Sequence, residues 1–311
     1  MGSPEDEPLT DAFQRERRGL LAHAYRMLGS HHEAEDAVQD TYLRAMRGWP
    51  AFEHRSSVRT WLYRIATNAC LTALDGRGRR ALPSGLAPPS PDPAAPPDPL
   101  GPAAWIEPLP TDPADVVTAR EGVRLAFIAG LQLLPPRQRA VLLLREVLAF
   151  SAAEVGAMLD LSVPAVKSAL QRARARLDEA APTRDDILEP TSPRARELLA
   201  GYLAAWEAAD ADAFGRVLRA DAAIEPVGSR TWFAGRDTCL AFAAPGMGAA
   251  GDWRMVPVCA NDQPAVLAWF RGEPFGLAVL TTAADGITAV TLFGDPALVG
   301  RFQDVGRLEQ V

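Results

Sequence analysis

The sequence predicts a multi-domain protein in which two all-α domains are followed by a C-terminal α+β domain. Its 311 residues suffice for two or three domains, each with a core of its own. A segment from 81 to 119 contains twelve prolines and neither lysine nor arginine. Proline at that density blocks helices and central strands. Apolar residues recur at helical spacing before residue 181, whereas most strand-like runs follow residue 250.

The composition is that of a soluble globular protein, with 48% hydrophobic and 23% charged residues. No apolar run is long enough to span a bilayer, and the acidic N-terminus, Met1–Pro8, does not resemble a secretory signal. We therefore expect a cytoplasmic protein with no membrane partner. Three distant cysteines, Cys70, Cys239 and Cys259, lack metal-ligand spacing. We expect no metal and no cofactor, and an inert buried thiol at Cys70.

The net charge of −7 argues mildly against a nucleic-acid partner, but local patches decide such binding. Lys167 is the only lysine, and arginine supplies the other basic charge. This usage is typical of a GC-rich genome, such as an actinobacterial one, so arginine richness alone does not indicate DNA binding.

Residues 10–80 are predicted to form the first all-α domain. Ser30 and Glu33 make a capping-box pattern at the start of one helix. A polar loop, 53–57, precedes a second helix over 58–74, which ends in a basic run. The first helix has its apolar positions at Ala34, Ala37, Val38, Ala45 and Met46. By pattern alone, the acidic residues between them form a solvated helix face.

Residues 81–119 are predicted to be an acidic, extended linker with polyproline character. Its one apolar island, Trp105–Pro110, is available to dock on another surface.

Residues 120–181 are predicted to form a second all-α domain that contains a helix-turn-helix. Ser151 with Glu154 makes another capping box, and Ser162 caps the helix that follows the turn. That last helix has an apolar stripe of Val166, Leu170, Ala173 and Leu177, with polar and basic residues opposite. Such a helix can enter the major groove of DNA while its stripe packs on the scaffold. A solvated arginine-rich face is the alternative.

Residues 192–298 are predicted to form the α+β domain. Helices begin at Ser192, at Asp210 or Asp212, and near Gly235. Strand-like runs at 253–258, 265–271, 275–282 and 287–293 are joined by turn-forming residues. We therefore expect helices packed on an antiparallel sheet.

The segment 134–174, with Leu134–Glu146, Ser151–Val155 and Ser162–Arg174 in register, resembles region 4 of the extracytoplasmic-function (ECF) sigma factors. The resemblance implies that the helix-turn-helix recognises the −35 promoter element and that the domain binds the flap of the RNA polymerase β subunit. The residues expected to contact the −35 element are Pro164, Ala165, Lys167, Ser168, Gln171, Arg172 and Arg174.

The first domain resembles region 2 of the same family. Ala34–Ala45 is similar to the helix that binds the β′ clamp helices of core RNA polymerase, and Ser57–Asn68 is similar to the segment that recognises the −10 element. The residues expected to bind polymerase are Glu35, Asp36, Gln39, Asp40 and Leu43. The residues expected to contact −10 DNA are His54, Arg55, Ser56, Arg59, Trp61, Arg64, Asn68, Arg77, Arg79 and Arg80. A core position for Trp61 and a simply exposed His54 are the alternatives.

The segments Arg196–Asp210 and Trp232–Asp237 resemble the SnoaL-like domain, a cone in which helices close one side of a curved sheet around a pocket. Such a pocket could hold a small molecule, and the candidate lining residues are Glu225, Trp232, Phe233, Trp253, Trp269 and Phe293. Only Glu225 is a carboxylate within an apparent strand, which is weak support for acid–base chemistry. We therefore expect a module that tunes sigma activity and not an enzyme.

Two alternatives remain open from the sequence. We expect a sigma factor that binds core RNA polymerase and directs transcription from specific promoters, with its activity tuned by the C-terminal domain. The first alternative is a one-component DNA-binding regulator with a ligand-sensing domain that never joins polymerase. The C-terminal cone is either a regulatory module or an enzyme acting on a small apolar molecule.

Overall fold

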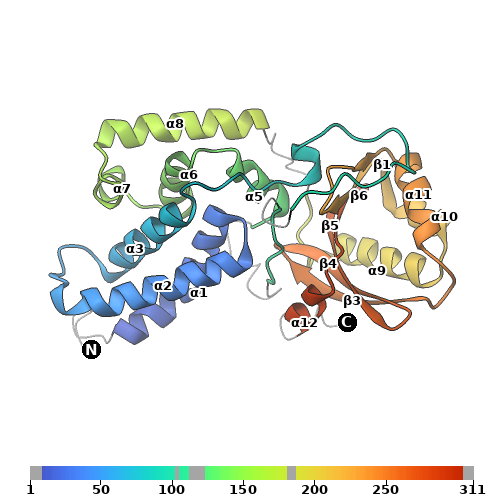
Figure 1. The fold of residues 1–311 in the computed structure, drawn as a ribbon, viewed down its shortest axis with the longest axis horizontal. Coiled ribbons are helices and arrows are strands. Elements are labelled where there is room, and N and C mark those ends of the chain that lie inside the picture. The colour runs from blue at the N-terminus through green and yellow to red at the C-terminus, as the bar shows by residue number, and fades with distance from the viewer. Residues whose placement is uncertain (1–8, 102–104, 112–122, 181–186, 304–311) are drawn as a thin grey trace. The chain divides into compact units, whose positions relative to one another are not determined.

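The structure is a computed structural model that describes residues 9–101, 105–111, 123–180 and 187–303. The chain divides into two compact units, drawn in Figure 1. The helical unit consists of residues 1–80 with 125–183, and the sheet unit consists of residues 81–124 with 184–311. The end of the predicted linker, 112–119, lies outside the described residues. No helix in the described part of the chain is long and apolar enough to cross a membrane.

The helical unit begins with three helices that the sequence predicts only in part. They are α1 (Leu9–Leu28), α2 (His31–Gly48) and α3 (Val58–Ala73), with a 3-10 turn, η1 (Trp49–Ala51), after α2. The Ser30 hydroxyl accepts a hydrogen bond from the Glu33 N–H at 3.2 Å, and so caps α2. Cys70 is fully buried in α3, and desolvation raises its thiol pKa to about 12, so the thiol is inert as expected.

The second half of the helical unit contains the predicted helix-turn-helix. Its helices are α5 (Leu125–Gln132), α6 (Pro136–Leu142), a π-helical turn η4 (Leu143–Val147), α7 (Ala152–Leu159) and α8 (Val163–Ala180). The capping box at α7 is complete. The Glu154 N–H donates to the Ser151 hydroxyl at 3.2 Å, and the Ser151 N–H donates to the Glu154 carboxylate at 2.8 Å.

The sheet unit contains a six-stranded sheet with the order β2-β1-β6-β5-β4-β3. Its strands are β1 (Leu218–Val227), β2 (Phe233–Ala234), β3 (Trp253–Ala260), β4 (Gln263–Phe270), β5 (Glu273–Ala283) and β6 (Gly286–Phe293). The prediction of an antiparallel sheet is wrong at one position, because β1 and β6 are parallel. The strands β3 to β6 form a meander, and its last strand pairs with β1, which entered the sheet much earlier in the chain.

Both faces of this sheet are covered. The helices α9 (Pro193–Glu207), α10 (Ala211–Val217) and α11 (Arg236–Ala243) share one apolar core with alternate strand residues such as Ile224 and Val266. The remaining β4 residues, including Leu267, are buried on the opposite face. A helix that the sequence did not predict, α12 (Ala297–Gln303), packs against β4 and β5.

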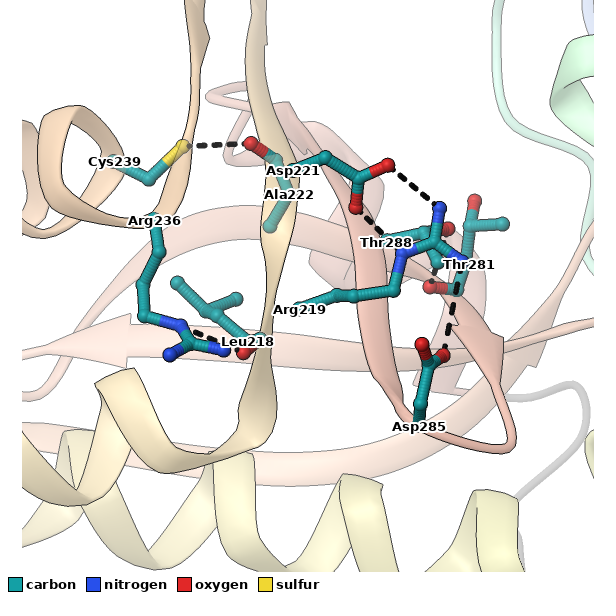
Figure 2. A network of polar contacts seen from close by, with 9 residues as sticks. All are labelled: Leu218, Arg219, Asp221, Ala222, Arg236, Cys239, Thr281, Asp285 and Thr288. Atoms are coloured by element: carbon teal, nitrogen blue, oxygen red, sulfur yellow. Dashed lines mark hydrogen bonds and ion pairs between the residues drawn. The ribbon is translucent and has the colours of Figure 1, made fainter.

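A polar network holds α11 and the β5–β6 turn to β1, as Figure 2 shows. Arg219 pairs with Asp221 on its own strand, at 2.5 Å and 2.9 Å, and lies 3.7 Å from the Asp285 carboxylate in the turn. Arg236 of α11 donates from Nε to the Leu218 carbonyl at 3.0 Å. These contacts hold the first residues of β1 in place beside α11 and the β5–β6 turn.

The described part of the proline-rich linker is bound along the sheet unit. Backbone hydrogen bonds run from the Ser90 N–H to the Trp232 carbonyl (2.8 Å) and from the Leu100 N–H to the Gly228 carbonyl (3.1 Å). Further along, the Asn261 N–H donates to the Leu109 carbonyl at 2.9 Å. The predicted apolar island does dock here, since Trp105, Ile106 and Leu109 are all buried. The described part of the linker includes a short 3-10 turn, η2 (Pro83–Gly85), and belongs to this unit's fold.

Candidate nucleic-acid and protein interfaces

The turn between α7 and α8 has the geometry of a helix-turn-helix. Asp160 ends α7 in the left-handed conformation, with φ 54° and ψ 49°, and the Leu161 N–H donates to the Gly156 carbonyl at 2.9 Å. A Cβ at Gly156 would lie 2.6 Å from the Leu161 carbonyl oxygen, so this position requires glycine. The turn is therefore tightly packed, as a fixed angle between two DNA-binding helices requires.

The helix α8 has one buried face and one exposed face. Of the predicted apolar stripe, Val166 and Ala173 are fully buried, whereas Leu170 and Leu177 are half-buried. Ala169 beside them is 7% exposed, so this side of α8 faces the scaffold. The predicted −35 contacts Pro164, Lys167, Ser168, Gln171, Arg172 and Arg174 are all exposed, while Ala165 is half-buried. The structure therefore brings this predicted set together on one surface.

Two basic side chains of α8 contact the scaffold. Arg174 donates from Nε to the Glu146 carboxylate at 3.1 Å, and this contact raises the pKa of Arg174. Arg176 reaches the Gln138 side chain at 3.5 Å. Both residues steady the helix on α6 and η4, whereas Lys167 and Arg172 lie nearer the N-terminal end, which enters the groove in helix-turn-helix proteins.

An aromatic cluster that the sequence analysis did not predict joins the predicted −10 segment to the residues just before it. Phe52 stacks on Trp49 and on Trp61, with ring centroids 5.5 Å and 4.7 Å apart, and His54 lies 4.6 Å from Phe52. Trp61 is half-buried, so it is neither a core residue nor fully exposed. His54 is exposed with a positive φ of 52°, so the loop 53–57 projects from this aromatic base.

The other predicted −10 residues separate into two groups. The side chains of Arg55, Ser56, Arg64 and Asn68 are exposed, and Arg64 lies one helical turn before Asn68 on α3. Arg77 and Arg80 instead pair with Glu33 at the start of α2, the second at 2.9 Å. Arg79 is exposed beside them. Arg59 donates to the Leu148 carbonyl, before α7, at 3.2 Å, and lies 3.7 Å from the Glu16 carboxylate of α1.

The predicted polymerase-binding residues lie on one exposed face of α2. Asp36 and Gln39 are exposed, and Glu35 and Asp40 pair with Arg17 (3.0 Å) and Arg44 (2.7 Å). Leu43 is 44% exposed, and Met46, which helical spacing had counted among the apolar positions, is 52% exposed on the same face. Two exposed large apolar side chains beside carboxylates are typical of a protein-binding surface.

The six candidate pocket residues of the sheet unit are not brought together. Phe233 and Trp253 belong to the apolar core between the helices and the sheet. The Glu225 carboxylate and the Trp232 indole contact the linker, at Ser84 and Ala87. Trp269 lies outside that core with the Arg254 guanidinium 4.4 Å above its ring, and Phe293 is likewise buried outside it.

Comparison with known proteins identifies the family of the helical unit. Residues 12–80 match the family described as Sigma-70 region 2, and residues 124–177 match Sigma-70, region 4. The chain is 46% identical over 299 residues to the ECF RNA polymerase sigma factor SigG of Mycobacterium tuberculosis, covering 92% of this chain and 81% of that protein. The chain belongs to the ECF sigma factors. This ECF sigma factor therefore directs transcription initiation by RNA polymerase at promoters.

Two further comparisons extend over the C-terminal domain. The probable ECF RNA polymerase sigma factor SigI of M. tuberculosis is 25% identical over 307 residues, covering 94% of this chain and 95% of that protein. The crystal structure of M. tuberculosis SigJ superposes with a TM-score of 0.65 at 20% identity, over 94% of this chain and 98% of that one. The predicted architecture is confirmed: two helical sigma domains, regions 2 and 4, precede an α+β domain.

Proposed function

We propose that α8 of this sigma factor binds the −35 element through Lys167, Ser168, Gln171 and Arg172. The exposure of this whole set on one face, opposite the buried stripe, supports the proposal. Serine and glutamine side chains can hydrogen-bond to base edges, and the basic side chains can reach phosphates or guanine. Pro164 and Ala165 are small enough to let the helix approach the groove closely. Arg174 contributes mainly by holding the helix on Glu146.

We propose that the loop 53–57, with Arg64 and Asn68, binds the −10 element after the strands separate. The aromatic cluster beneath the loop supports this role, because single-stranded bases are held by stacking surfaces and by cationic groups. Core polymerase is proposed to bind the α2 face, where Leu43 and Met46 supply apolar contact area beside Asp36 and Gln39.

We propose further that the SnoaL-like domain tunes activity by holding the linker and is not an enzyme. The linker's hydrogen bonds to this domain support the proposal, since Glu225 and Trp232 both bind linker backbone atoms. An extended chain of 44 residues, 81–124, spans up to about 150 Å, whereas linker residues bound to the domain, such as Ser90 and Leu100, cannot extend freely. Docking thereby limits how far regions 2 and 4 can separate.

A small-molecule ligand in the cone is a second candidate for regulation. The Trp206 indole N–H is buried with no acceptor among the described residues. Such a donor would favour an apolar ligand that carries one acceptor atom.

Run-off transcription tests the proposed function. Core polymerase with the full chain should give a promoter-dependent transcript that core alone does not give. A Leu43→Ala, Met46→Ala double variant should lose core binding in a pull-down, whereas Leu86→Ala, at an exposed apolar side chain of the linker, should retain it. If the double variant binds core polymerase as well as Leu86→Ala does, the sites proposed for α2 are wrong.

A further inference from the structure

Three arginines follow α3 within four residues, and two of them converge on one carboxylate of region 2. The Glu33 Oε1 atom accepts a hydrogen bond from the Arg77 guanidinium and another, at 2.9 Å, from Nη2 of Arg80. Two guanidinium groups that meet at a single oxygen form a site for an anion. Carboxylate and phosphate oxygens offer a guanidinium the same kind of acceptor, so a phosphate can take the place of Glu33 at this site.

Local structure brings Glu33 and Arg77 together. The Ser30 hydroxyl accepts from the Glu33 N–H at 3.2 Å and so fixes Glu33 in the first turn of α2. After α3 ends, Gly76 takes a positive φ of 71°, and the Arg77 N–H donates to the Leu74 carbonyl at 3.3 Å. This turn returns the chain toward the start of α2, where Arg77 meets the carboxylate.

The two arginines differ in their exposure. The Arg80 side chain is 11% exposed and that of Glu33 is 22% exposed, whereas the Arg77 side chain is 50% exposed. A largely buried carboxylate needs a cationic partner, and Arg80 remains as that partner when Arg77 leaves. Arg77 can therefore exchange Glu33 for an incoming phosphate, while Arg80 stays bound to Glu33.

We propose that Glu33 competes with the DNA backbone for Arg77, so that Arg77 binds a phosphate only by exchanging its ion-pair partner. This proposal rests on the proposed function, in which region 2 binds DNA at the −10 element, and adds a residue that sets the strength of that binding. Phosphate contacts carry no sequence information and strengthen specific and non-specific binding alike. A carboxylate that competes for one such contact therefore keeps binding to non-promoter DNA weak.

Glu33→Gln tests the competition. The amide keeps the size of the side chain, and the Ser30 cap uses only the backbone of residue 33, but the charge that holds Arg77 is lost. In complex with core polymerase, the affinity for a labelled promoter duplex and for a scrambled duplex should rise by the same factor, about threefold to tenfold. Fluorescence anisotropy at about 0.15 M salt measures both affinities. An unchanged or lower affinity would overturn the proposal.

Asp75→Asn is the matched control for long-range electrostatics. Asp75 is exposed two positions before Arg77, and its carboxylate forms no ion pair in the described part of the chain. The variant removes one negative charge from the same segment but releases no arginine, so the affinity should change by less than about twofold in screened solution. An equal rise in Asp75→Asn and Glu33→Gln would show that charge alone causes the effect, and the competition would be refuted.

A double-variant cycle then tests whether the gain passes through Arg77. Arg77→Ala should lower the affinity for both duplexes and reduce the slope of log affinity against log salt concentration by about one. Adding Glu33→Gln to Arg77→Ala should give no further rise, because the arginine for which Glu33 competes is absent. Unchanged affinity in Arg77→Ala, or a full gain from Glu33→Gln in its background, contradicts the proposal.

Failure of the proposed function has a different signature. A wild-type chain that gives no promoter-dependent transcript with core polymerase contradicts the proposed function itself. The competition is instead measured on complexes that do transcribe, as differences in affinity between variants.

Discussion

The Glu225 carboxylate accepts a hydrogen bond at 2.9 Å from the backbone N–H of Ser84, 141 positions earlier in the chain. In the sequence Glu225 is the one carboxylate of the C-terminal domain within an apparent strand, and hence the candidate acid or base. In the structure it lies on the face of β1 opposite the core residue Ile224. Its position at the linker favours a structural role in docking over catalysis in the cone.

Glu225→Gln should weaken the binding of the linker to the sheet unit. A neutral amide oxygen accepts a weaker hydrogen bond than a carboxylate, so docking should lose about 1 kcal/mol and amide exchange near Ser84 should quicken about fivefold. Hydrogen exchange with mass spectrometry of peptides covering 81–90 measures this. Glu273→Gln, at an exposed position on β5, should leave the exchange unchanged. Unaltered exchange in Glu225→Gln would contradict the docking role.

The sequence predicts well those features whose cause is local. The capping box at Ser151, the helix-turn-helix and the exposed face of α8 follow from local spacing, and the structure has each of them. Of the box predicted at Ser30 only the Ser30 cap is formed, because the Glu33 carboxylate pairs with Arg77 and Arg80. Met46 shows the limit of that reasoning, because an apolar residue at helical spacing is equally compatible with a core and with a binding surface.

The features that the sequence could not predict depend on distant pairs. The parallel pairing of β1 with β6 joins residues such as Leu218 and Ile287, and no local pattern specifies the partner of a strand. The linker's composition predicts an extended chain but not the surface on which it lies. The contact of Arg59 with Phe150 joins residues 91 positions apart, so no local pattern indicates it.

Lys167→Ala should weaken binding to promoters by a similar factor for all sequences. Lys167 is exposed near the N-terminal end of α8, where an ammonium group can neutralise a phosphate. Losing one phosphate contact should reduce the slope of log affinity against log salt concentration by about one. Fluorescence anisotropy of the polymerase complex on a labelled promoter duplex, between low and moderate salt, measures the slope. Arg196→Ala, exposed on α9, is the control, and an unchanged slope in Lys167→Ala would count against the contact.

Because His23 is buried in its neutral form, the helical unit should become less stable in mild acid. Its Nε2 lies 2.9 Å from the Thr67 hydroxyl, which itself donates to the Tyr63 carbonyl at 2.7 Å. The hydroxyl must therefore accept from Nε2–H, and Nδ1 is buried without a partner among the described atoms. Burial, and secondarily the charge of Arg26, lowers the pKa of His23 from 6.5 to about 3.

The pH range follows from the sign of that shift. The folded state keeps His23 neutral down to about pH 3, whereas the unfolded chain binds a proton below about pH 6.5. Stability is thus fully present above 6.5, and the free energy of unfolding should fall by about 1.4 kcal/mol per pH unit below it. Urea unfolding at about pH 7.5, 6.0 and 5.0, which span this pH range, measures how the free energy of unfolding changes with pH. His23→Gln should flatten it, but His32→Gln, at an exposed histidine, should not.

Gly156→Ala should damage the helix-turn-helix more than its small size suggests. The added methyl would lie 2.6 Å from the Leu161 carbonyl oxygen, and backbone atoms cannot rotate away as a side-chain end can. We expect region 4 to lose about 1–3 kcal/mol of stability and the −35 contacts to weaken, because the angle between α7 and α8 must open. Gly300→Ala in α12 is the matched control, since a Cβ there meets no atom within 4 Å. Thermal unfolding and run-off transcription with both variants measure the two effects. If Gly156→Ala melts and transcribes like Gly300→Ala, the turn is not the rigid element that the −35 proposal requires.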